Sequence, residues 1–439
     1  MTEFLSTAPY RGTRDFLPPE MSIRQQVFSL LYETVERFGF VRYDGPLLEA
    51  AEIYEAKSGE EIANQQLYTL TDRGERRLAL RPEMTPSAAR IVAGHLKELR
   101  LPVRWYSHPS CYRYERPQRG RVREHWQLNV DIFGSDRMEC EIEIFEVIHA
   151  IMCAVGATPD MYVLRANDRV LTDGMLEHIV RVPADCAQAV ATVIDRWEKR
   201  TPQQRQEEAH AAGLDDRAFE ALAEALLAGD ALLDELPEDV KQRSRLWPIL
   251  QCDARELVTF DPLIVRGFEY YTSTVFEVFD RDPLNRRSLF GGGRYDNLVE
   301  LFSRQQVPGI GFGMGDVTLV DFLQTHDLLP SARSEVDIVV IALDDHLQPV
   351  IRRLAAELRD AGHRTSIPLA ARRLGKHLAH ADDAGARVAV IVGADEHEQG
   401  TVVVRDLAAH EQRIVPTDAL VDAANEILNQ HPVRGTPAR

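Results

Sequence analysis

Five arginines crowd a short block in the first third of the chain, between Cys111 and Asp131. A planar guanidinium matches the oxygens of a phosphate, and a hairpin could hold one arginine rigidly while its loop carries the others. These residues are Arg113, Arg116, Arg119, Arg121 and Arg123. Gln127 and Asp131 follow in phase, so that both lie on one face of the second strand. The block predicts a site for an anionic ligand, and the alternative is a charged hairpin exposed to solvent.

A carboxylate and a hydroxyl stand at a predicted chain reversal, where Leu80 ends a strand and a helix then continues through Ile91. They belong to Glu83 and Thr85. Both could contact a ligand at that corner, whereas the commoner use of such residues is to cap the helix. The sequence leaves both uses open.

Glycines recur beside cations and tyrosines further along the chain. Arg266 shortly precedes the adjacent Tyr270 and Tyr271, and a run of three glycines leads into Arg294 and Tyr295. Glycine lets the backbone approach a ligand closely, although it serves ordinary turns more often. These two blocks are therefore further candidates for a binding site.

Glycines occupy alternate positions from Gly309 to Gly315, which leaves one face of the predicted strand without side chains. A flat group could lie on that face, and the alternative is close packing of the sheet against a helix. The spacing differs from the dinucleotide-binding fingerprint, whose glycines stand at a strand-to-helix turn. We expect Asp316 to cap the helix that follows.

The elements that must position these residues mix strands and helices without regular alternation. Helical spacing predicts a helix over Pro18–Phe40, and Asp72–Gly74 marks a hairpin turn. Further strands are predicted over Arg104–Tyr114, His125–Phe133, Val275–Phe279 and Val307–Met314. Clustered strands with few crossover helices favour an α+β core, with a mostly antiparallel sheet flanked by helices.

Two changes of pattern divide the chain into domains. Strand patterns vanish over about 173–252, where Ala184–Glu198 and Asp216–Leu227 show helical periodicity, so we predict a helical insertion there. After a linker that ends at Ser334, strand and helix patterns alternate, which predicts a separate α/β domain over 335–430. The first domain accordingly spans 1–330, and the insertion interrupts it.

Composition excludes several broad classes of protein. The 439 residues include 51 Lys plus Arg and 69 Asp plus Glu, a net charge of −18, so a nucleic acid would need a local basic surface. One candidate surface comprises Arg372, Arg373, Lys376 and His377. Five separated cysteines argue against a disulfide framework or a thiolate zinc site. Without an apolar run near the roughly 18 residues of a membrane span, or a secretory pattern at the start, we expect a cytoplasmic protein.

Taken in order, these blocks resemble the histidyl-tRNA synthetase family of class II aminoacyl-tRNA synthetases over nearly the whole chain. Gly12–Pro18 is similar to the family's opening signature, Gly45–Glu49 to the first class-defining motif, which contributes to dimerisation, and Tyr112–Gln118 to the second. The remaining similarities are to two signatures particular to the histidine enzymes and to their anticodon-binding domain, at Arg266–Tyr271, Gly292–Asp296, Leu358–Gly362 and Val390–Glu396.

The resemblance implies histidine–tRNA ligase activity, in which L-histidine and ATP form histidyl-adenylate and the histidyl group then passes to the 3′ end of its tRNA. It implies ATP as a substrate with Mg²⁺ beside it, histidine tRNA as a partner, and a homodimer. Arg113 would contact the α-phosphate, and Arg266 would bridge that phosphate and the substrate carboxylate. Arg121 would hold the β and γ phosphates, and Glu115 the adenine amino group.

The resemblance also implies a histidine pocket, because a pocket that bonds both ring nitrogens rejects analogues that lack them. Its members would be Glu83, Thr85, Gln127, Asp131, Tyr270, Tyr271 and Tyr295. The first two would hold the α-amino group, the next two the amino and carboxylate side, and Tyr271 and Tyr295 the imidazole. Arg116 and Gln118 match loop residues that contact the extra guanosine at the 5′ end of histidine tRNA. Nothing in the sequence forms a dedicated metal cage.

One position departs from the family pattern. The third class-defining motif usually ends in an arginine that contacts ATP, and Thr318 stands where that arginine is expected. A hydroxyl cannot replace a delocalised cation. Another arginine of the hairpin, or Mg²⁺, would have to compensate at the γ-phosphate.

Two other functions compete with the ligase. One is a non-catalytic paralogue that serves as the regulatory subunit of ATP phosphoribosyltransferase, a kind of protein that generally lacks the anticodon domain. The other is a tRNA-binding sensor that does not charge tRNA and would tolerate the loss of ATP contacts throughout. The presence of Arg266, Gly267 and a C-terminal domain, with one ATP contact changed, favours the ligase.

Overall fold

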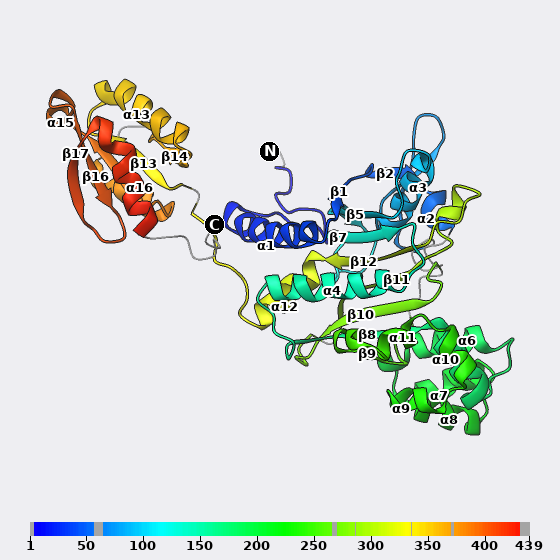
Figure 1. Cartoon of the computed structure of the whole chain (residues 1–439). Helices are drawn as coiled ribbons and strands as arrows, with labels where there is room; N and C mark the ends of the chain where they lie inside the picture. The colour runs from blue at the N-terminus through cyan, green and yellow to red at the C-terminus, as the bar shows by residue number, and fades with distance from the viewer. Residues whose placement is uncertain are drawn as a thin grey trace. The chain divides into compact units, whose positions relative to one another are not determined.

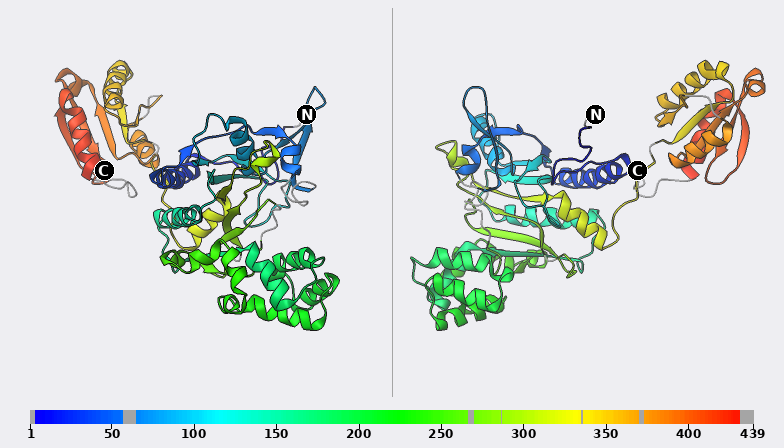
Figure 2. Two further views of the ribbon diagram at one scale, coloured as in Figure 1. Left: turned by 45° about the vertical axis from the view of Figure 1, so that its right-hand side comes forward. Right: turned by 180° about the vertical axis from the view of Figure 1, so that it is seen from behind.

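A computed structural model describes residues 4–56, 65–265, 270–285, 287–334, 336–369 and 373–430. The chain divides into two compact units, one over residues 1–15 and 27–329 and the other over residues 16–26 and 330–439 (Figures 1 and 2). Each unit has its own sheet and its own buried apolar cluster. The expected α+β core and the expected separate C-terminal unit are confirmed at this level.

The first unit contains a nine-stranded mixed sheet in the order β1-β5-β7-β12-β11-β10-β8-β9, with β6 paired to β7. The outer pairs β1–β5 and β8–β9 are parallel, and the pairs that join β5 to β8 are antiparallel. The strands are β1 (Val41–Arg42), β5 (Val103–Ser107), β6 (Ser110–Tyr112), β7 (Glu124–Phe133), β8 (Tyr162–Asp168), β9 (Thr259–Phe260), β10 (Thr274–Asp280), β11 (Ser288–Arg294) and β12 (Gly309–Gly315).

The strand predicted over Arg104–Tyr114 is broken into β5 and β6. Pro109 lies in the break, and a proline lacks the N–H that a continuous ladder needs. Both pieces still pair with β7, Ser107 opposite Asn129 and Ser110 opposite Trp126. The prediction of one continuous strand was therefore wrong, although both strands that replace it pair with the sheet.

Helices and a small sheet surround the large one. The sheet β2-β4-β3 contains the predicted hairpin around Asp72–Gly74. Its strands are β2 (Leu48–Ala50), β3 (Tyr68–Thr71) and β4 (Arg77–Leu80), and α2 is Glu52–Glu55. The other described helices between residues 18 and 329, outside 169–257, are α1 (Pro18–Arg37), α3 (Thr85–His95), α4 (Glu139–Ala154), the 3₁₀ turn η5 (Val299–Leu301) and α12 (Asp316–Thr325). Within the described residues, no helix is both long and apolar enough to cross a membrane.

Residues 169–257 form short helices between β8 and β9. Side chains cap several of them, since Asp168 accepts from Val170 N, Asp215 accepts from Ala218 N, and Thr201 forms a capping box with Gln204. The helices are α5 (Arg169–Gly174), η2 (Met175–Val180), α6 (Ala187–Asp195), η3 (Trp197–Lys199), α7 (Pro202–Ala211), α8 (Asp216–Leu227), α9 (Ala231–Glu235), α10 (Glu238–Arg243), α11 (Leu246–Leu250) and η4 (Asp253–Leu257). That they form an inserted domain with the predicted bounds stays a prediction.

The second unit has a five-stranded sheet in the order β14-β13-β15-β16-β17. Its strands are β13 (Ile338–Ala342), β14 (Thr365–Ser366), β15 (Val388–Val392), β16 (Thr401–Asp406) and β17 (Gln412–Pro416). Its helices are η6 (Asp345–Leu347), α13 (Gln348–Asp360), α14 (Leu374–Asp383), α15 (Ala394–Glu398), η7 (Thr417–Ala419) and α16 (Leu420–Gln430). Parallel pairing of β13 with β14 and β15 follows from the helices that connect them, as a βαβ pattern predicts.

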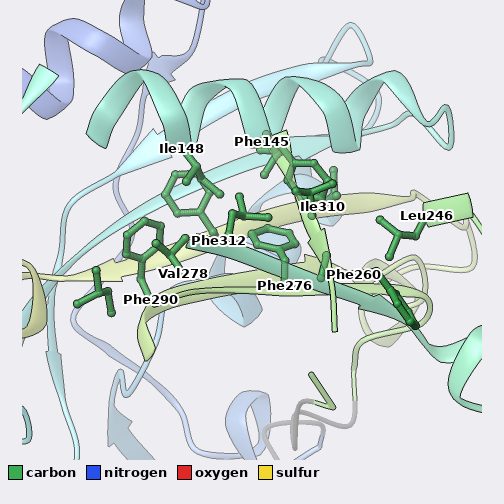
Figure 3. Close-up of a cluster of buried hydrophobic side chains, with 14 of the residues drawn as sticks. Phe145, Ile148, Leu246, Phe260, Phe276, Val278, Phe290, Ile310 and Phe312 are labelled. Carbon is green, nitrogen blue, oxygen red and sulfur yellow. The ribbon is translucent and has the colours of Figure 1, made fainter. Parts of the chain in front are cut away.

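The large sheet has two faces of opposite character because successive side chains of a strand point to opposite sides. One face is apolar and packs against α4, whose Phe145 and Ile148 lie over Phe276, Phe290 and Phe312 (Figure 3). Gln127 and Asp131 of β7, at the alternate positions, belong to the other face together with the glycines of β12. The strand period therefore separates an apolar core from a polar surface.

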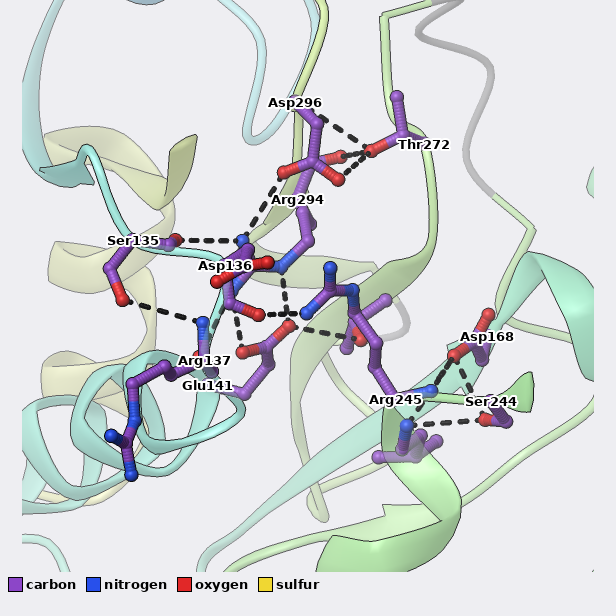
Figure 4. A network of polar contacts seen from close by, with 12 residues as sticks. Ser135, Asp136, Arg137, Glu141, Asp168, Ser244, Arg245, Thr272, Arg294 and Asp296 are labelled. Carbon is purple, nitrogen blue, oxygen red and sulfur yellow. Dashed lines mark hydrogen bonds and ion pairs between the residues drawn. The ribbon is translucent and has the colours of Figure 1, made fainter. Parts of the chain in front are cut away.

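A buried ion pair joins strand β11 to helix α4 on the core side (Figure 4). Arg294 Nε and Nη2 donate to the two carboxylate oxygens of Glu141 at 2.6 and 2.7 Å, and both side chains are fully buried. Arg294 Nη1 also donates to Asp296 Oδ1 and to the carbonyl of Ser135, each at 3.2 Å. A bidentate pair with these additional bonds fixes the end of β11 against the first turn of α4.

Replacing Glu141 by alanine should lower the free energy of unfolding of the first unit by about 3–5 kcal/mol, because it leaves a buried guanidinium without its counter-charge. Urea unfolding followed by tryptophan fluorescence measures this loss, since all four tryptophans lie in residues 105–247. Glu139→Ala is the matched control, because its carboxylate pairs with Arg137 on the exposed side of the same helix turn. An equal loss in both variants would contradict the assigned importance of the buried pair.

Candidate active site

A cavity of about 900 Å³ opens on the polar face of the large sheet. Its walls come from β7, β10, β11 and β12, from the start of α3, from the arginine-rich loop and from residues 194–200 of the helical segment. Nine residues predicted from the sequence line it, namely Glu83, Thr85, Arg113, Glu115, Arg121, Gln127, Tyr270, Tyr271 and Tyr295. The fold therefore gathers segments that lie as far apart in the sequence as Glu83 and Thr318.

Asp131 lies behind the cavity wall, where the hydroxyl of Tyr295 donates to its Oδ1. The carboxylate is 1% exposed, and its Oδ2 has no hydrogen-bond partner among the described residues. Burial raises the pKa of Asp131 to about 7, and the bond from Tyr295 offsets part of that rise. A buried acceptor of this kind suits a hydrogen-bond donor on a ligand.

The face of β12 that the alternating glycines leave bare is filled by the protein's own side chains. A Cβ at Gly311 would lie 2.5 Å from Asp131 Oδ1 and 2.7 Å from the hydroxyl of Tyr295, and one at Gly313 would lie 2.2 Å from Gln127 Nε2. Among the described residues a helix does not pack on this face, and Gly311, Gly313 and Gly315 line the cavity, so a flat ligand beside them stays a prediction. The glycines instead make room for the polar residues that line or back the cavity.

Glu83 and Thr85 do not cap helix α3. The N-cap position is Met84, and no side-chain capping bond is made there. The hydroxyl of Tyr270 instead donates to Glu83 Oε2 at 2.8 Å. Of the two uses that the sequence left open, the structure therefore excludes capping and places both residues in the cavity wall.

Asp316 does not cap helix α12 either, contrary to expectation. The N-cap is Gly315, and the carboxylate of Asp316 accepts from Arg14 Nη2 at 2.9 Å and from the backbone N–H of Trp126 at 3.0 Å. Asp316 thus ties the opening signature to β7 at the edge of the cavity. The sequence gives no signal for this pairing, because the partners are about 300 and 190 residues away.

The arginines of the hairpin take different positions. Arg113 follows β6 by one residue instead of lying in it, and its Nε donates to the carbonyl of Pro82 at 2.9 Å. Arg121 Nε lies 3.4 Å from Glu115 Oε2 at the cavity wall. Arg119 contacts Asp321, and Arg123 donates to the hydroxyl of Tyr10. The predicted strand, which included Arg113, was therefore wrong at this residue, whereas Arg119 and Arg121 lie on the loop before β7.

The other predicted site residues either lie away from the cavity wall or fall outside the residues that the structure describes. Arg116 and Gln118 are exposed on the hairpin loop and do not line the cavity. Arg266 lies outside the described residues, as does Arg372 of the predicted basic surface. Arg373 and Lys376 are exposed, but His377 is buried and cannot belong to that surface, because helix α14 turns it toward the interior.

Several cavity residues were not singled out from the sequence. Burial, with a contribution from the nearby cation Arg113, lowers the pKa of His125 to about 3, so its ring is neutral near pH 7. Arg165 donates to Asp261 at 3.1 Å and stacks on Phe279. The remaining unpredicted charged residues in the wall are Glu277, Arg287, Asp195, Arg196, Glu198, Lys199 and Arg200. The sequence could have indicated Glu277, because a charged residue inside an apolar strand is unusual. It contains no comparable pattern that would indicate the loop and helix residues.

Known proteins are similar to this chain in sequence and in fold. The family described as Histidyl-tRNA synthetase matches residues 12–317, and the family described as Anticodon binding domain matches residues 337–427. The Histidine--tRNA ligase of Leptospira biflexa is 39% identical over 416 residues, which cover 93% of this chain and 95% of that protein. The enzyme of the same name from Pyrococcus abyssi is 35% identical over 433 residues, covering 96% of this chain and 99% of that protein.

A solved structure agrees with these similarities. The crystal structure of histidyl-tRNA synthetase from Nostoc sp. PCC 7120 is similar with a TM-score of 0.81 at 25% sequence identity. The similarity covers 98% of this chain and 100% of that one.

Asp131→Asn should stabilise the ligand-free protein, and more so at pH 8 than at pH 5. The folded-state pKa of about 7 exceeds the unfolded value of about 3.9, so a favourable contribution from the protonated carboxyl is lost as pH rises toward 7. Asparagine keeps an acceptor for Tyr295 and cannot ionise. We expect its advantage to grow by roughly 2 kcal/mol between the two pH values.

Thermal unfolding of the wild type and the variant at both pH values measures this difference. Asp136→Asn is the control, because that carboxyl is exposed and should show no comparable pH-dependent gain. A variant that is less stable than the wild type at pH 8 would show that the buried carboxylate is favourable when ionised.

Proposed function

Because this chain belongs to the histidyl-tRNA synthetase family and is a histidine–tRNA ligase, we propose that its cavity binds L-histidine and ATP and forms histidyl-adenylate there. The observation that carries the proposal is one cavity in which buried carboxylates and tyrosines adjoin arginines. Carboxylates suit the ammonium and ring N–H groups of histidine, and arginines suit phosphate oxygens. Both kinds of group are required side by side for an amino acid to react with ATP.

Histidine would occupy the end of the cavity formed by the tyrosines and carboxylates. Glu83 and Thr85 would accept from the α-ammonium group, and Gln127, which lines the same cavity, would contact the amino and carboxylate side. Because Asp131 is hydrogen-bonded to Tyr295, we assign it to the imidazole side with that tyrosine, instead of to the amino and carboxylate side. Its unpartnered Oδ2 would accept a ring N–H. Tyr270 and Tyr271 close the pocket, with ring centroids 4.8 Å apart.

ATP would place its α-phosphate at Arg113, which the carbonyl of Pro82 holds next to Glu83. In the activation step a carboxylate oxygen of histidine attacks the α-phosphorus, the bond to the β-phosphate oxygen breaks, and pyrophosphate leaves with that electron pair. Arg113 would neutralise the charge on the α-phosphoryl oxygens. Arg266 is proposed to bridge the same phosphate and the histidine carboxylate, on the family resemblance alone.

Arg121 and Glu115 would serve the rest of the nucleotide, Arg121 at the β and γ phosphates and Glu115 at the adenine amino group. In the ligand-free protein they face each other, so ATP binding would separate them. Mg²⁺ would enter with ATP, as part of the substrate. The described residues contain no cluster of three or more His, Cys, Asp or Glu that could hold a metal ion, so phosphate oxygens would supply most of its ligands.

In the second step a hydroxyl of the terminal ribose of tRNA attacks the carbonyl carbon of the adenylate, and AMP leaves. Arg116 and Gln118, exposed on the hairpin loop, would contact the extra 5′ guanosine of histidine tRNA. The C-terminal unit would bind the anticodon, through Arg373 and Lys376 among others. These assignments supply the local basic surface that an acidic tRNA-binding protein needs.

A homodimer would form around the first class-defining motif. Val41, Leu47 and Leu48 are large apolar residues that stay exposed near it, and a second copy would cover them. Free cysteines among the described residues fit a reducing compartment, and we propose the cytoplasm. The regulatory-subunit alternative is not favoured, since the ligases at 35–39% identity match the C-terminal domain as well.

ATP–pyrophosphate exchange with each amino acid in turn tests the activation step. We expect exchange with histidine alone, and Arg113→Ala should lower its rate by roughly 10²–10³-fold, because the transition-state charge loses its fixed cation. Arg73→Ala, an exposed arginine of the β3–β4 hairpin, is the control. Exchange with another amino acid, or with none, would refute the proposal.

Charging of two tRNA transcripts, with and without the extra 5′ guanosine, tests the loop. The wild type should strongly prefer the complete transcript, and Arg116→Ala and Gln118→Ala should each bring the ratio of the two kcat/KM values closer to one. Arg73→Ala should keep the wild-type ratio. If the wild type charges both transcripts equally, the loop has no such role.

A further inference from the structure

Three segments that are distant in the sequence meet at one corner of the cavity, around Thr318. Its hydroxyl donates to the carbonyl of Leu289 in β11 at 2.5 Å. A Cβ at Gly120, on the arginine-rich loop, would lie 3.9 Å from the methyl group of Thr318. In the same loop Arg119 Nη2 donates to Asn285 Oδ1, in the β10–β11 turn, at 3.4 Å. The loop, the turn and the start of α12 therefore converge where the third-motif arginine is missing.

Arg287 belongs to the segment that reaches this corner. It follows Asn285 by two residues, precedes Leu289 by two, and lines the cavity. Its side chain is exposed, and it forms no hydrogen bond or ion pair with any described residue. A guanidinium carries five N–H donors, so Arg287 has its whole bonding capacity left for an anion in the cavity.

Most other cations of the cavity wall already have partners. Arg113 donates to a carbonyl, Arg121 faces a carboxylate, Arg165 is paired with Asp261, and Arg200 is paired with Glu208. Arg196 and Lys199 have no such partner in the described chain. No hydrogen bond among the described residues joins their segment to Thr318 or to the loop around Gly120. The segment that contains Arg287 is joined to both, through Leu289 to Thr318 and through Asn285 to Arg119 of the loop.

We propose that Arg287 supplies the cation for the terminal phosphates of ATP that an arginine at position 318 would otherwise supply. The inference rests on the proposed function, because it requires ATP in this cavity. When the α-phosphorus is attacked, the departing pyrophosphate gains negative charge, and Arg287 would bind its oxygens and stabilise it as a leaving group. Thr318 serves a different purpose, since its hydroxyl satisfies the Leu289 carbonyl and fixes β11 beside α12.

Arg287→Ala should raise the KM for ATP, and the KM for pyrophosphate in the reverse reaction, by about tenfold or more, because each loses charged hydrogen bonds. The KM for histidine should stay the same. The Kd of a non-hydrolysable histidyl-adenylate analogue should also stay the same, because such a compound lacks the β and γ phosphates. Arg304→Ala is the control, an exposed arginine of the same unit outside the cavity.

A second variant tests whether an arginine at position 318 can replace Arg287 as the cation for the terminal phosphates of ATP. Thr318→Arg in the Arg287→Ala background should lower the KM for ATP again, which a general effect of Arg287 on folding would not permit. Histidine-dependent exchange in the wild type, with unchanged KM values for ATP and pyrophosphate in Arg287→Ala, would overturn this inference alone. Absence of that exchange in the wild type would overturn the proposed function and this inference with it.

Discussion

The bidentate ion pair between Arg294 and Glu141 sets the position of β11, and the cavity depends on it. Arg294 points into the core, where it pairs with helix α4, and the next residue, Tyr295, points to the polar face and donates to Asp131. Because neighbouring residues of a strand point to opposite faces, the peptide link between Arg294 and Tyr295 connects the fully buried pair to the cavity wall. A buried pair is a weak source of net stability compared with apolar packing, yet it has directional geometry that apolar packing lacks. Its value here is in fixing one register of β11 and, with it, one position of Tyr295.

Strand periodicity and glycine together explain how a polar cavity can lie on a well-packed sheet. Apart from Arg294, the α4 side of β7, β10, β11 and β12 is largely apolar, while the other side of β12 carries glycines. Because a Cβ at Gly311 or Gly313 would overlap Asp131 or Gln127, the absence of side chains on β12 provides the space that the polar side chains of β7 occupy. The sheet thus holds Gln127 in the cavity wall and Asp131 just behind it, both rigidly backed. Rigid support of this kind is what a site needs if it is to position two substrates for reaction.

Burial also sets the protonation of the site. Asp131 has a raised pKa and His125 a lowered one, each because the charged form is poorly solvated. The ligand-free cavity therefore tends toward neutral forms of these two groups, whereas its arginines remain charged. Histidine, with an ammonium group and ring N–H groups, would favour ionised Asp131, and ATP would complement the arginines. In the proposed function the two substrates would meet opposite charges within one cavity, which is the electrostatic requirement of amino-acid activation.

Local sequence patterns determined the elements whose signals come from neighbouring residues. Helix α8 begins and ends at the predicted residues, Asp216 and Leu227, because helical period is a local property. The ordered motifs likewise indicated the family and nine residues that the fold gathers into one cavity. Tertiary structure alone decided which distant residues meet: Glu141 with Arg294, Arg14 with Asp316, and Leu289 with Thr318. Those meetings depend on the strand order β7-β12-β11. This order pairs Phe133 with the distant Gly309 and leaves no periodic trace in the sequence.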